Sequence, residues 1–345
     1  MSVAPYRHYS NLFGNVQQVA VRPGNTMSAE SKTATLEPVE AAAISGDPAA
    51  NRLAVIAAFF SIYAIWGSTY LAIRYAVAYI PPLYTAGFRH LVAGSILLLW
   101  ALAKGLRPTW PQIRASVVIG FLFFLIGHGT LHWAETHVAS GLASLLIASE
   151  PIWVFLMTCA AEKRWRVNGY LVAGVALGIA GVALLLGRDV WSAGSGVFLG
   201  AIGCLIGAIS WSAGIIYSRR SRLSGSPLLL SALSLLAGSA MLLVTGTIFG
   251  EYHGFTFASV PVRSWLALAY LIVFGSVIAF SAYNWLLERY SPTLVATHTY
   301  INPIVAVLLG WWFAGERVSL NILLSAGLVI AAVSLVDRGM ARLKV

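Results

Sequence analysis

Apolar segments of about 20 residues follow one another from residue 53 to residue 336, and short connections between them carry most of the charged side chains. A helix needs about 20 mainly apolar residues to cross the hydrocarbon layer of a bilayer. Only 10% of the residues are charged, whereas soluble domains contain about 25%. The chain is therefore predicted to be an all-α membrane protein. Ten transmembrane helices are expected, near residues 53–73, 83–103, 115–133, 138–160, 168–187, 196–217, 227–249, 264–286, 293–314 and 320–336.

Lysine and arginine are distributed unevenly between alternate connections. If the N-terminus is cytoplasmic, fourteen of them fall in or beside cytoplasmic connections and four, namely Arg74, Arg188, Arg263 and Arg317, in or beside external ones. Because cytoplasmic connections of membrane proteins are rich in Lys and Arg, both termini are predicted to be cytoplasmic. The same distribution accounts for the net charge of +10 without a nucleic-acid partner.

The first 50 residues differ from the rest of the chain. They mix Ser, Pro, Gly, Asn and Glu without helical periodicity, so residues 1–50 are predicted to be a disordered cytoplasmic segment. They also lack the apolar stretch of a cleavable secretory signal. The connections farther along are too short for an ATPase domain, and no phosphate-binding loop or nucleophile motif is found. No cofactor is therefore expected.

The second half of the sequence resembles the first half. L-V-A-G-S-I-L-L-L at 91–99 is repeated as L-L-A-G-S-A-M-L-L at 235–243, and Trp66 is repeated as Trp211. Each copy contains five predicted spans. Because five is odd, the second copy enters the membrane from the opposite side, which predicts two inverted five-helix repeats.

Two predicted spans, one in each copy, contain a polar residue followed by proline: Glu150-Pro151 and Asn302-Pro303. Proline removes a backbone donor and leaves the carbonyl one turn back without its usual partner. Lipid supplies no water to replace that partner. Both spans are therefore predicted to be broken helices, and paired broken helices indicate the binding site of a transporter.

Glu150 is the only acid well inside a predicted span. Acids within the membrane usually face a cavity or a partner, so Glu150 is predicted to contact a substrate and to carry a coupling proton, since loss of water favours the neutral carboxyl. A structural alternative stays open, in which a neighbouring hydroxyl or the broken backbone satisfies the carboxyl.

His128, His132 and Glu135 share one helix face, because they are spaced by four and three residues. Two histidines one turn apart with a third ligand can bind zinc. Since Glu135 lies at the water boundary, we instead expect His128 and His132 to line the substrate path, and we expect no metal. Hydrogen bonds between helices are the alternative role of the two histidines.

Other polar and aromatic residues complete the predicted substrate site. Trp66 and Trp211 are related by the repeat and could form aromatic walls, while His298 and Asn302 are one turn apart beside the second proline. Thr69 and Asn284 lie on the same spans as the aromatic residues. Arg89 is expected to reach the interface or a neighbouring helix rather than a substrate carboxylate. The full predicted set is Trp66, Thr69, His128, His132, Glu150, Trp211, Asn284, His298 and Asn302.

Four motifs, in this order, carry a resemblance to a known family. They are W-G-S-T-Y (66–70), P-P-L-Y-T-A-G-F-R-H-L-V-A-G (81–94), A-S-L-L-I-A-S-E-P (143–151) and N-P-I-V-A-V-L-L-G-W-W-F-A-G-E-R (302–317). This pattern resembles the EamA family of the drug/metabolite transporter superfamily. The resemblance implies ten helices, a cavity between the two halves and export of amino acids or other small metabolites. It divides the chain into repeats 51–190 and 191–338 and a cytoplasmic tail 339–345.

The sequence thus predicts a secondary transporter of the plasma (bacterial inner) membrane rather than an enzyme. It would export amino acids or related small metabolites by alternating access. Its expected partners are that substrate and the lipid bilayer. The glycine face of 168–187 is expected to pack tightly against another helix, and a homodimer contact through that face is the alternative. Two alternatives remain: a metal-dependent membrane enzyme using His128, His132 and Glu135, and a non-transporting membrane scaffold or sensor.

Overall fold

The computed structural model describes residues 48–163, 167–187, 190, 194–221, 226–287, 289–290, 292–295 and 297–343. All regular structure within these ranges is helical, and residues 54–345 form one compact unit. The predicted disordered segment lies outside the described residues up to residue 47. The helices are α1 (Pro48–Phe60), η1 (Ser61–Ile65), α2 (Trp66–Val77), α3 (Pro82–Ala103), α4 (Trp110–Ile119), η2 (Gly120–His128), α5 (Gly129–Ala134), α6 (Ser140–Ile147), α7 (Glu150–Glu162), α8 (Gly169–Leu185), α10 (Ser195–Arg220), α11 (Pro227–Ile248), η3 (Phe257–Ser259), α12 (Val262–Tyr270), η4 (Leu271–Ile278), α13 (Ala279–Leu287), α14 (Pro292–Val295), α15 (His298–Ala314) and α16 (Leu320–Leu343).

Eight helical segments in the described part of the chain are long and apolar enough to cross a membrane. They correspond to eight of the ten predicted spans, so the chain is a multi-pass membrane protein. The other two predicted spans are helical but shorter: 168–187 is α8, and 293–314 is divided between α14 and α15. At the C-terminus α16 continues to Leu343, beyond the predicted end at residue 336.

Local sequence explains where several helices begin. Pro82 and Pro227 occupy the first turns of α3 and α11, where the missing N–H of proline has no helical partner in any case. Thr109 and Gln112 form a capping box at the start of α4. Asn168 accepts a hydrogen bond from the Leu171 N–H at the start of α8. These residues fix the first turn of each of the four helices.

The two predicted breaks have different outcomes. Around Glu150-Pro151, α6 ends at Ile147 and α7 begins at Glu150, as the sequence predicts. The prediction of a break at Asn302-Pro303 is wrong, because Pro303 lies inside α15 and the interruption comes before His298. Asn302, with its amide nitrogen facing the carbonyls, donates to the His298 oxygen at 3.1 Å. This bond lies within the turn before the proline, and α15 continues through Pro303 to Ala314.

Three spans contain π-helical segments, which the sequence did not reveal. These segments are η1, η2 and η4. The last two lie near the middle of their spans, Trp110–Ala134 and Val262–Tyr283, which are corresponding spans in the two predicted repeats. π-Helical turns inside α-helices are frequent at functional sites.

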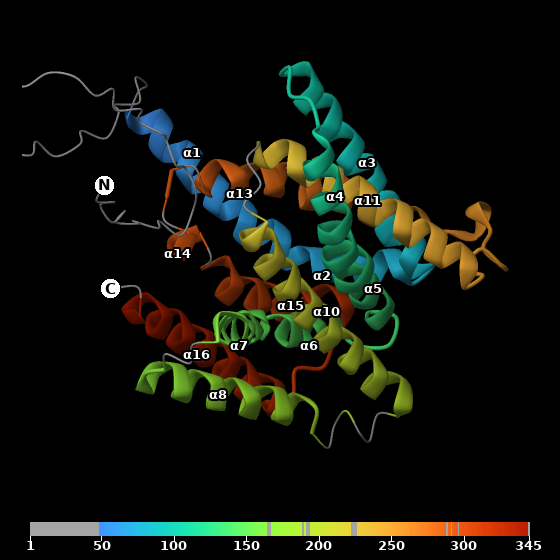
Figure 1. Ribbon diagram of the computed structural model, residues 1–345. Coiled ribbons are helices and arrows are strands. Elements are labelled where there is room, and N and C mark those ends of the chain that lie inside the picture. Colours follow the sequence, from blue (N-terminus) through green and yellow to red (C-terminus); the bar gives the residue numbers. More distant parts are fainter. Residues whose placement is uncertain are drawn as a thin grey trace, which may run out of the picture. The chain divides into compact units, whose positions relative to one another are not determined.

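Two helix pairs make close contacts across the two halves of the chain: α3 with α11, and α8 with α16. The second pair lies side by side in Figure 1. The glycine face of α8 packs closely on α16. A Cβ added at Gly174 would lie only 2.9 Å from the Ala332 carbonyl oxygen and 2.8 Å from a Val336 methyl. This glycine face is therefore used inside the chain, and a homodimer would need a different surface.

Gly174→Ala is expected to destabilise the protein by about 1–3 kcal/mol, because the added methyl overpacks the α8–α16 contact. Gly327→Ala is the matched control on α16, where a Cβ meets nothing within 4 Å. The control should stabilise by roughly 0.5–1 kcal/mol, since alanine loses less backbone entropy in a helix. Thermal unfolding in detergent measures both variants. Equal shifts in the same direction would contradict close packing at Gly174.

Candidate functional site

Glu150 lies at the first turn of α7, directly after the interruption between α6 and α7. Its side chain is half-buried, and its carboxylate makes no hydrogen bond or ion pair with another described residue. Tyr70, Arg219 and Tyr283 lie within electrostatic range of that carboxylate. The structural alternative considered for Glu150, a carboxyl satisfied by a neighbouring hydroxyl, is therefore not observed among the described residues.

An aromatic cluster lies at the junction of three spans. The Trp66 ring lies 5.2 Å from the Tyr283 ring and 4.9 Å from the His298 ring, and Tyr283 and His298 are 5.8 Å apart. The Trp66 indole N–H donates to the Gly275 carbonyl in η4 at 3.0 Å, so the π-helical segment fixes its orientation. All three rings are half-buried. Because Tyr283 also reaches Glu150 electrostatically, the cluster and the carboxylate belong to one region.

Asn302 and Thr69, both predicted to line the substrate site, donate hydrogen bonds to backbone carbonyls. The Asn302 amide nitrogen donates to the carbonyls of Ile62 at 3.2 Å and Tyr63 at 3.1 Å, besides that of His298. The Thr69 hydroxyl donates to the Trp66 carbonyl at 2.6 Å within its own helix. Asn302 thus ties α15 to the π-helical segment η1. Asn284 lies in α13, but its side chain is outside the described part of the chain.

The predicted residues Trp211, His128 and His132 lie in a second cluster, apart from the Trp66 group. Trp211 stacks on Phe123 and His128, with centroid distances of 4.3 and 5.1 Å. His128 Nδ1 lies 2.8 Å from His90 Nε2, and His132 Nδ1 lies 2.7 Å from the His128 carbonyl oxygen. The contact between His128 and His90 joins two helices, whereas the bond of His132 lies within its own span. In the described residues, no three side chains of ligand type are arranged to hold a metal ion.

Arg89 is almost completely buried, with 4% of its surface exposed. Its Nε donates to the Ser276 hydroxyl in η4 at 2.9 Å. The side chain therefore packs against a neighbouring helix, as predicted, rather than extending to the surface.

A buried ion pair joins distant segments at one end of the protein. Arg74 at the end of α2 lies 2.9 Å from Glu316, and Glu316 accepts from the N–H groups of Ser140 at 2.8 Å and Gly141 at 3.0 Å at the start of α6. Gly315 adopts φ +64°, which ends α15 and directs Glu316 back toward it. We call this region, which contains Arg74, Ser140 and Glu316, the Arg74 end.

The opposite end is marked by other contacts. Arg220 donates to the Ala161 carbonyl at 2.6 Å, and Asn168 donates to the Gly339 carbonyl at 2.9 Å. We call this region the Arg220 end. These contacts join segments near residues 161, 168, 220 and 339, which the Lys and Arg distribution assigned to one side of the membrane.

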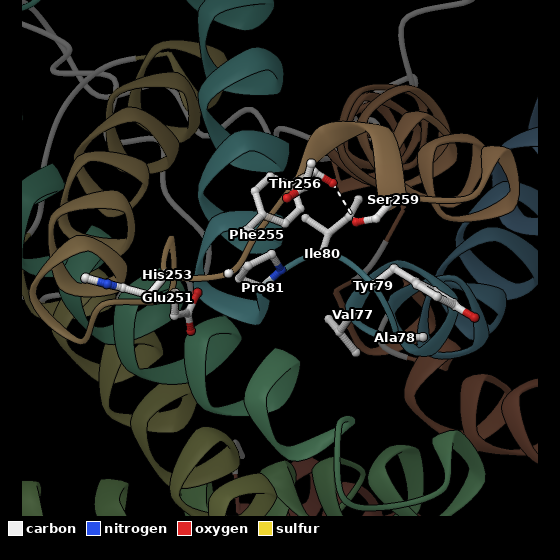
Figure 2. A pocket seen from close by; sticks show the side chains of 11 residues that line it. Val77, Ala78, Tyr79, Ile80, Pro81, Glu251, His253, Phe255, Thr256 and Ser259 are labelled. Atoms are coloured by element: carbon white, nitrogen blue, oxygen red, sulfur yellow. Dashed lines mark hydrogen bonds between the residues drawn. The ribbon is translucent and has the colours of Figure 1, made fainter.

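A cavity of about 300 Å³ opens at the Arg74 end, between residues 77–81 and the segment around Glu251–Ser259. Figure 2 shows Glu251 and His253 on one side of it and Phe255 and Thr256 on another. The Glu251 carboxylate accepts from the Leu83 N–H at 3.0 Å and so caps α3. Partial burial raises the pKa of Glu251. This cavity is lined by different residues from the Glu150 region.

Sequence reasoning missed several of these residues. The repeat relates Arg219 to Arg74, since each lies eight residues after its tryptophan, but the sequence did not indicate that Arg219 lies near Glu150. The contacts of His90 with His128 and of Glu316 with Arg74 could not be found, because these partners are distant in sequence. Tyr283 was one aromatic residue among several at the end of its span.

Comparisons with known proteins agree with this architecture. A model described as "EamA-like transporter family" matches residues 52–187 and 198–337. The chain is 38% identical over 296 residues to "Uncharacterized inner membrane transporter YedA" of Escherichia coli K12, covering 83% of this chain and 92% of that protein. It is 27% identical over 293 residues to "Uncharacterized transporter YvbV" of Bacillus subtilis 168, covering 83% and 92%. A solved protein structure with 22% identity aligns with a TM-score of 0.58 over 84% of this chain and 99% of the other, a likeness of fold.

Proposed function

Since this chain belongs to the EamA-like transporter family, we propose that it is a secondary transporter of the inner membrane. It exports amino acids or related small metabolites by alternating access. Ten transmembrane helices form two inverted repeats, both termini are cytoplasmic, and the substrate binds between the halves. A small molecule and the lipid bilayer are its partners. Any homodimer would use a surface other than the α8 glycine face.

The observation that carries this proposal is the Glu150 carboxylate at a broken span. It is half-buried in an apolar protein and has no hydrogen bond or ion pair among the described residues. Leaving a charged group in this state is costly, and intramembrane acids of this kind commonly mark a substrate or ion path. The half-buried rings of Trp66, Tyr283 and His298 offer an adjacent wall for the apolar part of a substrate.

The inverted repeat is supported by the pattern of packing. The α3–α11 and α8–α16 pairs each join one span to its sequence counterpart, and the contact of α10 with η2 and α5 is matched by the contact of α2 with α12 and η4. Trp66 lies 6.1 Å from Phe280 in the span containing η4, and Trp211 lies 5.1 Å from His128 in the span containing η2. An axis in the membrane plane would relate these contacts.

Purified protein in liposomes provides the test. Vesicles are loaded with amino acids, related carboxylic or amine metabolites, or nucleosides, and release of each compound is followed with and without a proton gradient. We expect saturable release of compounds from one of the first two classes, above the leak of protein-free vesicles. Folded protein that releases none of them faster than empty vesicles would contradict the proposed function and favour a scaffold or sensor.

A further inference from the structure

Glu135 is a second buried acid, distant from the break at Glu150. It is the first residue after α5 and lies just outside the span Trp110–Ala134. Its side chain is 4% exposed, and both carboxyl oxygens are buried without a hydrogen-bond partner among the described residues. A buried carboxylate without donors is strongly disfavoured, whereas the neutral acid is tolerated far better. Burial, and then the nearby Glu316, raise the pKa of Glu135 well above its usual range.

The charged and titratable groups that face Glu135 come from every element packed around it. They are Tyr70 and Arg74 of α2, Arg89 of α3, Cys204 of α10, and Glu316 after α15. Neither cation makes an ion pair with Glu135, because Arg74 is paired with Glu316 at 2.9 Å and Arg89 Nε donates to Ser276 at 2.9 Å. Glu316 carries the same charge that Glu135 would acquire.

An ionised Glu135 would therefore compete with Glu316 for Arg74. Glu316 cannot turn away without cost, because its carboxylate also accepts hydrogen bonds from Ser140 and Gly141 at the start of α6. We call the Arg74 end closed when Glu316 joins Arg74 to the start of α6, as it does here. In this closed form, the Arg74 end thus accommodates one carboxylate and one neutral carboxyl.

We propose that Glu135 is a proton-binding site of the transport cycle, occupied while the Arg74 end is closed and emptied when that end opens to water. Tyr70 lies within electrostatic range of both Glu135 and Glu150. This inference rests on the proposed alternating-access function. It adds a proton site on the far side of the substrate region from the Arg220 end.

The sign of the pH dependence follows from linkage. A carboxyl that binds its proton more tightly in the closed form stabilises that form at low pH, where the carboxyl is protonated in both forms. As the pH rises, the open form ionises first. The closed form loses this advantage as the pH rises from the usual glutamate range through the raised pKa of Glu135. Alkaline conditions therefore favour opening of the Arg74 end.

A cysteine introduced by Ala139→Cys reports on opening, because Ala139 is half-buried at the start of α6 and the native Cys159 and Cys204 are buried. Its labelling by a membrane-impermeant thiosulfonate is compared in protein with Glu135 and with Glu135→Gln. The rate in protein with Glu135 is divided by the rate in Glu135→Gln, and this ratio cancels the intrinsic pH dependence of the thiol. We expect a ratio near one below about pH 4, where both forms are protonated, rising with pH by up to about tenfold for each pKa unit between the open and closed forms. A ratio that stays constant with pH would overturn the proposal.

Infrared spectroscopy of the protonated-carboxyl band provides a second reading. At neutral pH we expect Glu135→Gln to lose a band that Glu251→Gln retains, and Glu135→Asp to keep a titrating band. Identical bands in wild type and Glu135→Gln would show that Glu135 is ionised and would overturn the proposal. If Glu135→Gln does not fold, Glu135→Asp decides it by whether its band and pH-dependent labelling persist. Neither measurement needs a substrate, so failure here is distinguishable from failure to find substrate flux.

Discussion

Glu150→Gln is expected to reduce proton-gradient-driven accumulation of the substrate by at least about tenfold, equivalent to about 1.4 kcal/mol or more of lost coupling. Glutamine keeps the size of the side chain but cannot release a proton. The half-buried Glu150 carboxylate has no partner among the described residues, so the substitution breaks no hydrogen bond that holds the fold. The loss should therefore appear in transport rather than in thermal stability.

The control is Glu251→Gln, the same chemical change at the cap of α3. It should leave gradient-driven accumulation close to the wild-type level. The two variants are compared in liposomes at several values of external pH. If Glu150→Gln accumulates substrate as well as the wild type across that range, Glu150 does not couple transport to protons.

Glu316→Ala is expected to lower the free energy of unfolding by about 2–3 kcal/mol, because buried hydrogen-bond donors at the start of α6 lose their acceptor. The loss of the ion pair adds less, since the Arg74 side chain is 35% exposed and water screens its charge. Glu316 is 8% exposed, and its carboxylate holds Arg74, Ser140 and Gly141 together. Without it, an arginine and the first N–H groups of α6 lose their acceptor at the same time.

Arg74→Ala should cost less than Glu316→Ala, because the Arg74 side chain is 35% exposed and water screens its charge. The double variant measures the coupling between the two residues. Unfolding is followed by denaturant titration in detergent. Additive effects of the two substitutions would contradict a coupled ion pair at the Arg74 end.

The spans were predictable because their determinants are local. Length, apolar composition and the proline at the start of α3 or α11 act within one segment, and most predicted ends lie within a few residues of the observed ones. The break before Glu150 was predictable for the same reason. The course of the helix through Pro303 was not predictable, because the contacts that the neighbouring Asn302 makes with η1 and α15 join segments far apart in sequence.

The site was predictable only in part. Glu150 stood out as a lone acid in an apolar segment, and Trp66 and His298 proved to be neighbours. His128 and His132 share a helix face as expected, but the partner of His128 is His90 on α3, which no spacing rule relates to it. Likewise, Glu135 lacks a hydrogen-bond partner among the described residues because Arg74 forms its ion pair with Glu316. Packing between segments far apart in sequence decides which of these side chains become partners.

Counterflow in liposomes tests most directly whether one central site is exposed to the two sides in turn. Vesicles containing the protein are loaded with an unlabelled compound that the release experiment identifies, and the labelled compound is added outside without an ion gradient. The account predicts transient uptake of label that requires the internal compound, because the site returns loaded. It also predicts that Glu150→Gln retains this exchange. Uptake of label that is equally fast into vesicles without internal compound would indicate a channel and would contradict alternating access.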